Sequence, residues 1–198
     1  MRERVDGYFR TLWRLASDTV ATDRDGALIE VGTALERYVA AAAAAHQGGC
    51  KLMFIGNGGS AGIASHMAID YSKNGGLRSL AFNDGAALTC LGNDLGYENV
   101  FAKQIEIHAR AGDILIAISS SGRSPNILRA VAAARAAGVG FVLTLSGFLP
   151  DNPLRRLGDA NLHVPSGQYG FVEISHLALC HAALDIFMGW GEENPFPG

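Results

Sequence analysis

Apolar residues in the N-terminal part of the chain recur every three to four positions, which is the spacing of one helix face. This stripe predicts a helix over residues 1–25, and a second stripe predicts another from about residue 25 to 46. The second helix includes an alanine run at 40–45, which favours helix formation and close helix packing. Gly48 and Gly49 follow it as an expected stop. The first helix must cover another surface, either on its own domain or on another subunit.

From residue 49 onward the pattern changes to short continuous apolar runs separated by helical stripes. Such runs are typical of strands buried on both faces of a parallel sheet. The predicted strands cover residues 51–55, 78–82, 114–118, 140–145 and 160–164. The predicted helices cover residues 63–71, 86–91, 101–109, 125–137 and 171–188. Strands that alternate with helices predict an α/β fold, a doubly wound sheet of about five mostly parallel strands flanked by helices.

Polar loops leave two of these strands. Residues 56–60 read Gly-Asn-Gly-Gly-Ser, and residues 119–124 carry four serines, a glycine and an arginine. Each loop leads into a helix, whose free N–H groups attract an anion. Either loop alone could be an ordinary capped turn, but both leave strands at the edge where ligands bind in such sheets. We therefore interpret them as a phosphate site. The glycines and lysines do not follow the order of a P-loop, which argues against nucleoside triphosphate hydrolysis.

Titratable side chains on two predicted helices form a second candidate site. His66 and Asp70 are four residues apart, and Glu173 and His181 are eight apart with His176 between them, so each pair shares a helix face. Two histidines and two carboxylates can ligate a divalent metal of the zinc, iron or manganese type. They can equally act as general acid and base without metal. Each histidine taken singly could instead be a core residue, and the sequence does not show that the helices meet.

Composition and charge limit the class of protein. Of 198 residues, 48% are hydrophobic and 18% charged, and the net charge of −3 gives no basic field for nucleic acid. We find no run of about 18 apolar residues for a membrane span, and no secretory signal in residues 1–20. Cys50, Cys90 and Cys180 are odd in number and lack CxxC spacing, so we expect buried free thiols. These features predict a cytoplasmic protein that contacts neither nucleic acid nor membrane.

Taken together, these motifs resemble the sugar isomerase (SIS) domain, and within it the phosphoheptose (sedoheptulose 7-phosphate) isomerases. The resemblance extends from the N-terminal helices to about residue 188. The segments and residues that carry it are Gly56 to Ala61, His66, Asn93 to Glu98, Phe101, Gln104, Gly112 to Ile116, Ser119 to Asn126, His176 and His181. It implies a homotetramer with sites shared between subunits. On this basis we divide the chain into N-terminal helices for oligomerisation (1–48), a phosphosugar-binding SIS domain (49–190) and a tail (191–198).

The resemblance also implies an activity and roles for individual residues. The activity is aldose–ketose isomerisation of a sugar phosphate, most simply sedoheptulose 7-phosphate, by proton transfer through an enediolate. Asp70, Glu173 and His181 are the expected catalytic residues, and together with His66 they are expected to ligate a divalent metal, zinc in particular. The residues expected to bind the substrate and its phosphate are Asn57, Gly58, Gly59, Ser60, Asn93, Asp94, Ser119, Ser120, Ser121 and Ser124.

Two residues at the chemical centre differ from the family pattern. The family has a glutamate where this chain has Asp70, and a glutamine where it has Glu173. Aspartate is shorter by one methylene, and a displacement of about 1 Å can reduce a rate about 100-fold. We hypothesise that Asp70 ligates the metal while Glu173 takes the proton. The alternatives are a different substrate, a non-catalytic sugar-phosphate-binding or regulatory protein, and a tetrameric protein that associates with a replication initiator.

Overall fold

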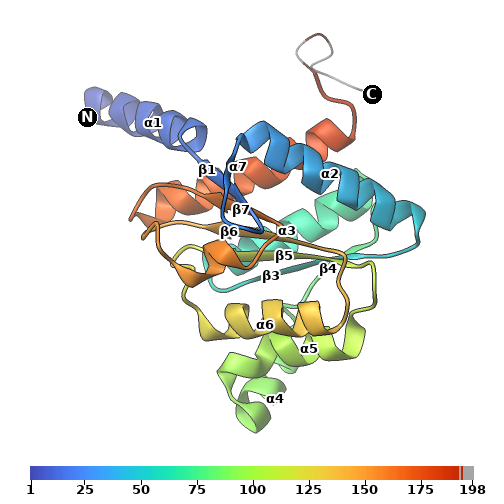
Figure 1. Cartoon of the computed structure of the whole chain (residues 1–198). Helices are drawn as coiled ribbons and strands as arrows, with labels where there is room; N and C mark the ends of the chain where they lie inside the picture. The colour runs from blue at the N-terminus through green and yellow to red at the C-terminus, as the bar shows by residue number, and fades with distance from the viewer. Residues whose placement is uncertain (192, 194–198) are drawn as a thin grey trace.

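A single mixed sheet covered by helices on both faces forms the body of the computed structural model, which describes residues 1–191 and 193 (Figure 1). The sheet has seven strands in the order β2-β1-β7-β6-β5-β3-β4. Five of them are parallel: β3 (Leu52–Gly56), β4 (Ser79–Ala81), β5 (Ile114–Ser119), β6 (Phe141–Ser146) and β7 (Ala160–His163). They correspond to the five strands predicted from the sequence, so the α/β class and the parallel core of the sheet are confirmed.

The prediction of only five strands was wrong, because an antiparallel hairpin extends the sheet beyond β7. The hairpin consists of β1 (Val20–Asp23) and β2 (Leu28–Ile29), where the sequence analysis extended two helices. The helices are shorter than expected, with α1 at Arg2–Ser17 and α2 at Val31–Gln47. Between the strands the chain turns at Gly26, whose φ of 82° is in the left-handed region.

Helices cover both faces of the sheet, as a doubly wound fold requires (Figure 1). One face carries α2, α3 (Gly59–Lys73) and α7 (Tyr169–Phe187), with α1 against α7. The other carries α4 (Gly85–Leu95), α5 (Val100–His108) and α6 (Pro125–Ala136). Two short 3-10 helices, η1 (Tyr97–Asn99) and η2 (Pro153–Arg156), complete the described elements.

Strand β5 shows why the continuous apolar runs of this chain form strands. All six of its residues are buried. Ile114, Ile116 and Ile118 pack into the core beneath α2, α3 and α7. Leu115 and Ala117 face the opposite way, into the core with α5 and α6. A strand covered on both faces has no solvent side to occupy with polar residues, so alternation is lost.

Helix α7 is long and apolar enough, by length and composition, to span a membrane. In this structure it packs instead as a core helix against α1, α2 and α3. Its residues Phe171, Val172, Leu179 and Leu184 are buried there.

All three cysteines are free, as predicted, but only Cys180 is buried, and burial raises the pKa of its thiol to about 12. Cys90 is exposed, so the expectation of three buried thiols was wrong. The predicted tail at 191–198 lies mostly outside the described residues.

The strand order places the two polar loops side by side. β3 and β5 are hydrogen-bonded neighbours, yet the chain leaves β3 toward β4 on one side and leaves β5 toward β6 on the other. Helix α3 then covers one face, and α6 covers the other. This is the topological switch point of a doubly wound sheet, where the carboxyl ends of two strands open a crevice for a ligand.

Candidate active site

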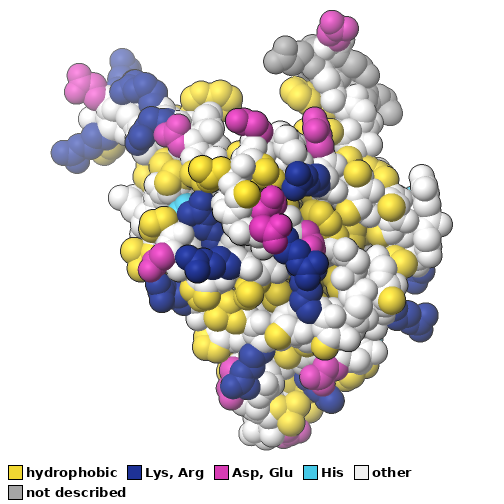
Figure 2. Space-filling view, viewed as in Figure 1, with side chains coloured by type: hydrophobic (Ala, Val, Ile, Leu, Met, Phe, Trp, Pro, Cys, Tyr) yellow, Lys and Arg dark blue, Asp and Glu magenta, His cyan; other side chains and the backbone are white. Residues whose placement is uncertain are grey.

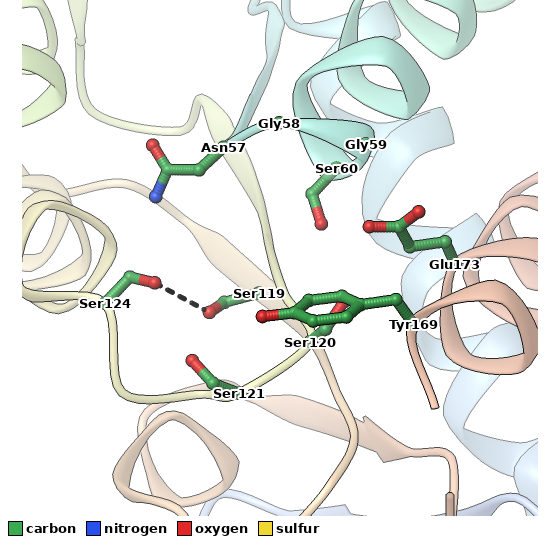
Figure 3. Close-up of a pocket in the computed structure, with 10 residues that line it drawn as sticks. All are labelled: Asn57, Gly58, Gly59, Ser60, Ser119, Ser120, Ser121, Ser124, Tyr169 and Glu173. Atoms are coloured by element: carbon green, nitrogen blue, oxygen red, sulfur yellow. Dashed lines mark hydrogen bonds between the residues drawn. The ribbon is translucent and has the colours of Figure 1, made fainter. Parts of the chain in front are cut away.

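A pocket of about 240 Å³ lies at this switch point (Figure 3). It collects the residues that follow β3, the residues that follow β5, and two side chains from the first turns of α7. The lining residues are Asn57, Gly58, Gly59, Ser60, Ser119, Ser120, Ser121, Ser124, Tyr169 and Glu173. Eight of the ten residues expected to bind substrate are therefore in one pocket. Its lining includes no lysine or arginine, so any attraction for an anion comes from hydroxyls, amides and helix N-termini.

The glycine loop brings the backbone close to the pocket. Gly58 is the N-cap residue of α3 and has a φ of 54°, which a residue with a side chain rarely adopts. A Cβ added at Gly59 would lie 2.3 Å from Glu173 Oε2, so only glycine fits there without displacing that carboxylate. The next residue, Ser60, is buried and lines the pocket. The first turn of α3 thus points its free N–H groups at the space where an anion would bind.

The serine loop (residues 119–124) precedes helix α6, but its hydroxyls remain available for other hydrogen bonds. Ser124 is the N-cap of α6, but its side chain makes no hydrogen bond to the helix N–H groups. Its Oγ lies 3.2 Å from Ser119 Oγ instead (Figure 3). The Ser120 hydroxyl is buried without a hydrogen-bond partner in the described part of the chain. Hydroxyls with unused bonding capacity in a pocket are what phosphate recognition needs, which favours that interpretation over simple capping.

Asn57 is held in place by side chains that the sequence analysis did not assign. Its amide makes two reciprocal hydrogen bonds with the Asn126 amide, each 2.9 Å. The Tyr97 hydroxyl also donates to Asn57 Oδ1 at 3.1 Å. Asn126 and Tyr97 are thus the residues that position this loop. Their motifs were visible in the sequence, but no spacing rule links residue 57 to residue 97 or 126.

Three of the four predicted metal-binding residues come together two to three turns further along α3. One ligand atom from each of His66, Asp70 and His181 lies within 4.8 Å of the others. His66 Nε2 is 3.4 Å from Asp70 Oδ2, and the two imidazole rings are 5.4 Å apart between centroids. Two donors bound to one tetrahedral zinc are about 3.4 Å apart. Helices α3 and α7 do meet, and two imidazoles with a carboxylate fit a zinc-type ion.

Glu173 is not part of this group. It lies two helical turns before His181 on α7, level with the start of α3, and its carboxylate contacts Gly59 in the pocket. A carboxylate is favourable there, because the N-terminus of a helix carries partial positive charge. Tyr169, one turn earlier on α7, lies before the helix predicted at 171–188, yet it lines the same pocket (Figure 3).

Three further residues of the sequence analysis lie elsewhere. Asn93 and Asp94 do not line the pocket, since they end helix α4, where the Asn93 amide donates to Asp94 Oδ1 at 2.8 Å. Helix α4 thus extends beyond the predicted range of 86–91, and both side chains are exposed. His176 is a core residue, and its Nε2 donates to the Ser146 carbonyl at 2.9 Å. Burial lowers its pKa to about 4, so the ring is neutral at pH 7.

Comparison with known proteins identifies the family and the fold. The SIS domain family model matches residues 7–146. The phosphoheptose isomerase of Bradyrhizobium sp. (strain ORS 278) is 40% identical over 178 residues, which cover 84% of this chain and 86% of that protein. The enzyme of Rhodospirillum rubrum is 37% identical over 140 residues, covering 67% of this chain and 73% of that protein.

Solved structures of two phosphoheptose isomerases have the same fold as this chain. The phosphoheptose isomerase of Neisseria gonorrhoeae superposes with a TM-score of 0.79 at 30% identity, covering 94% of this chain and 98% of that one. The enzyme of Francisella tularensis gives the same TM-score, 0.79, at 26% identity, over 94% and 97% of the two chains. This chain therefore belongs to the SIS domain family and, within it, to the phosphoheptose isomerases.

Proposed function

We propose that the protein catalyses the aldose–ketose isomerisation of a sugar phosphate, with sedoheptulose 7-phosphate as the substrate and a heptose 7-phosphate as the product. The observation that carries this proposal is the arrangement along α3. The anion pocket lies at the first turn of the helix, and the group of His66, Asp70 and His181 lies on its later turns and on α7. A sugar phosphate bound along α3 would have its phosphate at one end and its reactive carbons near titratable groups.

The phosphate is held by the pocket in this proposal. Hydroxyls of Ser119, Ser121 and Ser124 donate to phosphate oxygens, and the helix N-termini of α3 and α6 add N–H groups. Asn57 supplies its amide at the opposite wall. Asn93 and Asp94 are left out of this part of the proposal, since they do not line the pocket.

The chemistry requires a base that removes the proton beside the carbonyl and an acid that protonates the oxygen. In this proposal His181, whose imidazole lies in one group with His66 and Asp70, acts as the acid, and Glu173 acts as the base. When bound by His66, Asp70 and His181, zinc would supply a Lewis acid for the substrate oxygens. The group is half open to solvent, with His66 exposed, so a substrate can reach it.

Glu173 fits the hypothesis that the carboxylate roles are redistributed. It stands apart from the other three titratable residues and within the substrate pocket, as a proton-accepting residue would. In the proposed division, Asp70 ligates the metal and Glu173 takes the proton. The test is turnover of purified Glu173→Gln protein loaded with zinc. A large fall in kcat is expected, and unchanged turnover would reject the assignment.

The activity itself is tested by proton NMR in D₂O with sedoheptulose 7-phosphate and zinc-loaded protein. We expect exchange of the proton on the carbon beside the carbonyl, followed by the aldose. The same exchange measurement on a panel of other ketose phosphates identifies the preferred sugar. If sedoheptulose 7-phosphate raises the thermal unfolding midpoint but no sugar in the panel exchanges its proton, the protein binds sugar phosphates without catalysis and the proposal fails.

We also propose self-association through α1, as a homotetramer, and a cytoplasmic location. Helix α1 projects from the body of the protein (Figure 1), with Tyr8 stacked on Phe171 at 4.6 Å between ring centroids. On its other side Phe9 and Trp13 remain 62% and 76% exposed. Large exposed apolar groups favour an interface. Analytical ultracentrifugation should show a tetramer that dissociates in the Phe9→Ser, Trp13→Ser variant.

A further inference from the structure

A second pocket lies at the far edge of the sheet, between the β1–β2 hairpin and η2. Its volume is about 210 Å³, and it shares no lining residue with the pocket at the switch point. Figure 2 shows several Lys and Arg side chains on the face that carries this hairpin and η2. The lining residues are Thr22, Gly26, Leu28, Pro150, Arg155 and Arg156.

The charges of this pocket are all of one sign. Neither Arg155 nor Arg156 forms a salt bridge with any described residue, and the lining contains no carboxylate. The alternation of β1 explains this, because neighbouring strand residues face opposite ways. Thr22 faces the arginines, whereas Asp23 lines a different pocket together with Arg24. Two arginines therefore line one small pocket without a counter-charge from the described chain.

Polar atoms beside the pocket are also unpartnered. Thr22 is 5% exposed, and its hydroxyl has no hydrogen-bond partner among the described residues. The same holds for Arg155 Nε, while Arg155 Nη1 donates to the Pro150 carbonyl at 2.9 Å. A buried polar group without a partner is destabilising, so such groups usually indicate a ligand or an ordered water.

The arginines are carried on a fixed turn. The Asn152 side chain caps η2 by accepting a hydrogen bond from the Arg155 N–H at 3.2 Å, and it donates to the Leu149 carbonyl at 2.8 Å. The Leu154 N–H donates to the Gly122 carbonyl at 3.1 Å, which ties η2 to the serine loop. The backbone that carries the arginines therefore has little freedom left to lose when a ligand binds, which favours binding.

We propose that this pocket is a second phosphate site, in which the guanidinium groups of Arg155 and Arg156 bind a phosphate dianion. Guanidinium groups match the geometry of phosphate oxygens through paired N–H donors. The pocket is larger than one phosphate, and Leu28 and Pro150 give it apolar walls. The ligand is inorganic phosphate or a small phosphomonoester, which share this chemistry. The site is independent of the isomerase activity and stands if that activity is absent.

The test is equilibrium dialysis of the whole protein with radiolabelled inorganic phosphate. We expect two phosphates per chain in the wild type and one in the Arg155→Gln, Arg156→Gln variant. The Ser119→Ala, Ser124→Ala variant should retain the second site. Arg156 is exposed, so the single Arg156→Gln change should leave the fold intact and weaken the second site about tenfold, as loss of one charged hydrogen bond predicts.

Arg24→Gln is the matched control, because this arginine lies on the same hairpin but pairs with Asp159 at 3.8 Å. It should bind phosphate as the wild type does. Tighter competition by glycerol 3-phosphate than by unlabelled phosphate at the second site would identify a phosphomonoester as the ligand, and the reverse would identify inorganic phosphate. One phosphate per chain in the wild type, retained by the double arginine variant, would overturn the proposal. Equal weakening by Arg24→Gln and Arg156→Gln would also overturn it.

Discussion

The two ends of strand β5 use polar residues in opposite ways. At the amino end, Asp113 is 1% exposed, and its carboxylate accepts hydrogen bonds from the Lys51 and Arg110 N–H groups at 2.9 and 2.7 Å. It also pairs with the Lys51 ammonium group. At the carboxyl end, Ser120 is equally enclosed, yet its hydroxyl has no partner among the described residues.

Asp113 therefore stabilises the fold through its hydrogen bonds, whereas the Ser120 hydroxyl keeps its capacity to bind a ligand. A buried carboxylate surrounded by donors has no capacity left for anything else. A loop of hydroxyls that neither cap a helix nor pair fully with each other keeps that capacity. Changes at the amino end should therefore affect stability, and changes at the carboxyl end should affect activity.

The largest expected effect is at Asp70, in the group that it forms with His66 and His181. Asp70→Asn should lower kcat about 1,000-fold, because it removes a charge needed for proton transfer or metal binding. The measurement is the initial rate of aldose formation from sedoheptulose 7-phosphate with saturating zinc, alongside denaturant unfolding. Asp18→Asn, an exposed carboxylate paired with Arg14 on α1, is the control and should match the wild type. Wild-type turnover of the Asp70 variant would contradict the comparison.

The opposite result is expected at the amino end of the strand. Asp113→Ala should lower the free energy of unfolding by about 3 kcal/mol, because it breaks a buried ion pair and leaves two backbone donors unpaired. Urea unfolding measures this, and kcat of the folded protein should not change. Glu106→Ala removes the exposed pair with Lys103 and should cost less than about 0.5 kcal/mol. Equal losses in the two variants would show that the buried pair has no special role.

A third test uses pH, because buried His176, like Asp113, is a polar residue of the core and does not line the pocket. Burial lowers its pKa to about 4 from 6.5, so between these values the unfolded chain binds more protons than the folded one. Stability should then fall as pH decreases, by about 2 kcal/mol between pH 7 and pH 5 for this one group. His163, whose pKa is also lowered to about 4 by burial, acts in the same direction.

The measurement is the free energy of unfolding in urea at several pH values. His176→Asn should flatten the dependence, whereas His108→Gln, a change at an exposed residue, should leave it as in the wild type. Stability that stays constant from pH 7 to 5 in the wild type would mean that neither buried imidazole resists protonation.

The smallest effect distinguishes a ligand-binding serine from a capping residue. Ser124→Ala should raise KM about tenfold through loss of one hydrogen bond to phosphate. It should hardly change stability, because the side chain makes no cap hydrogen bond. Asp84→Ala is the counterpart at the N-cap of α4, where Asp84 accepts from the Ala87 N–H at 2.8 Å. That variant should lose about 1 kcal/mol of stability with KM unchanged. A reversed pattern would show that the serine loop is structural.

The sequence predicted those parts of the fold in which one pattern dominates. Buried strands such as β5 are apolar except at the carboxyl end, where β5 ends in Ser119, and helix α6 begins at Pro125 as its sequence indicates. The β1–β2 hairpin was missed because each strand is short and the preceding helical stripe was extended across it. The dipeptide Asp25-Gly26, a common hairpin turn, was the signal that could have revealed it.

For the candidate site, the sequence predicted the two loops but not the arrangement of longer side chains. Loop positions follow from strand order, whereas Glu173 depends on how α7 aligns with α3, which no local pattern encodes. On α7, two helical turns separate Glu173, in the pocket, from His181, in the group with His66 and Asp70. Asn93 and Asp94 lie outside the pocket, on helix α4, which continues to Leu95, beyond its predicted end at residue 91.

The brevity of the outermost strands has a consequence for behaviour in concentrated solution. β2 has two residues and β4 has three, although the sheet between them is broad. An exposed strand edge is a template on which foreign chains can add by backbone pairing, and a long flat edge invites fibril growth. Edge strands of two and three residues offer few unpaired backbone groups for such pairing. The native protein should therefore resist edge-to-edge aggregation even in crowded solution.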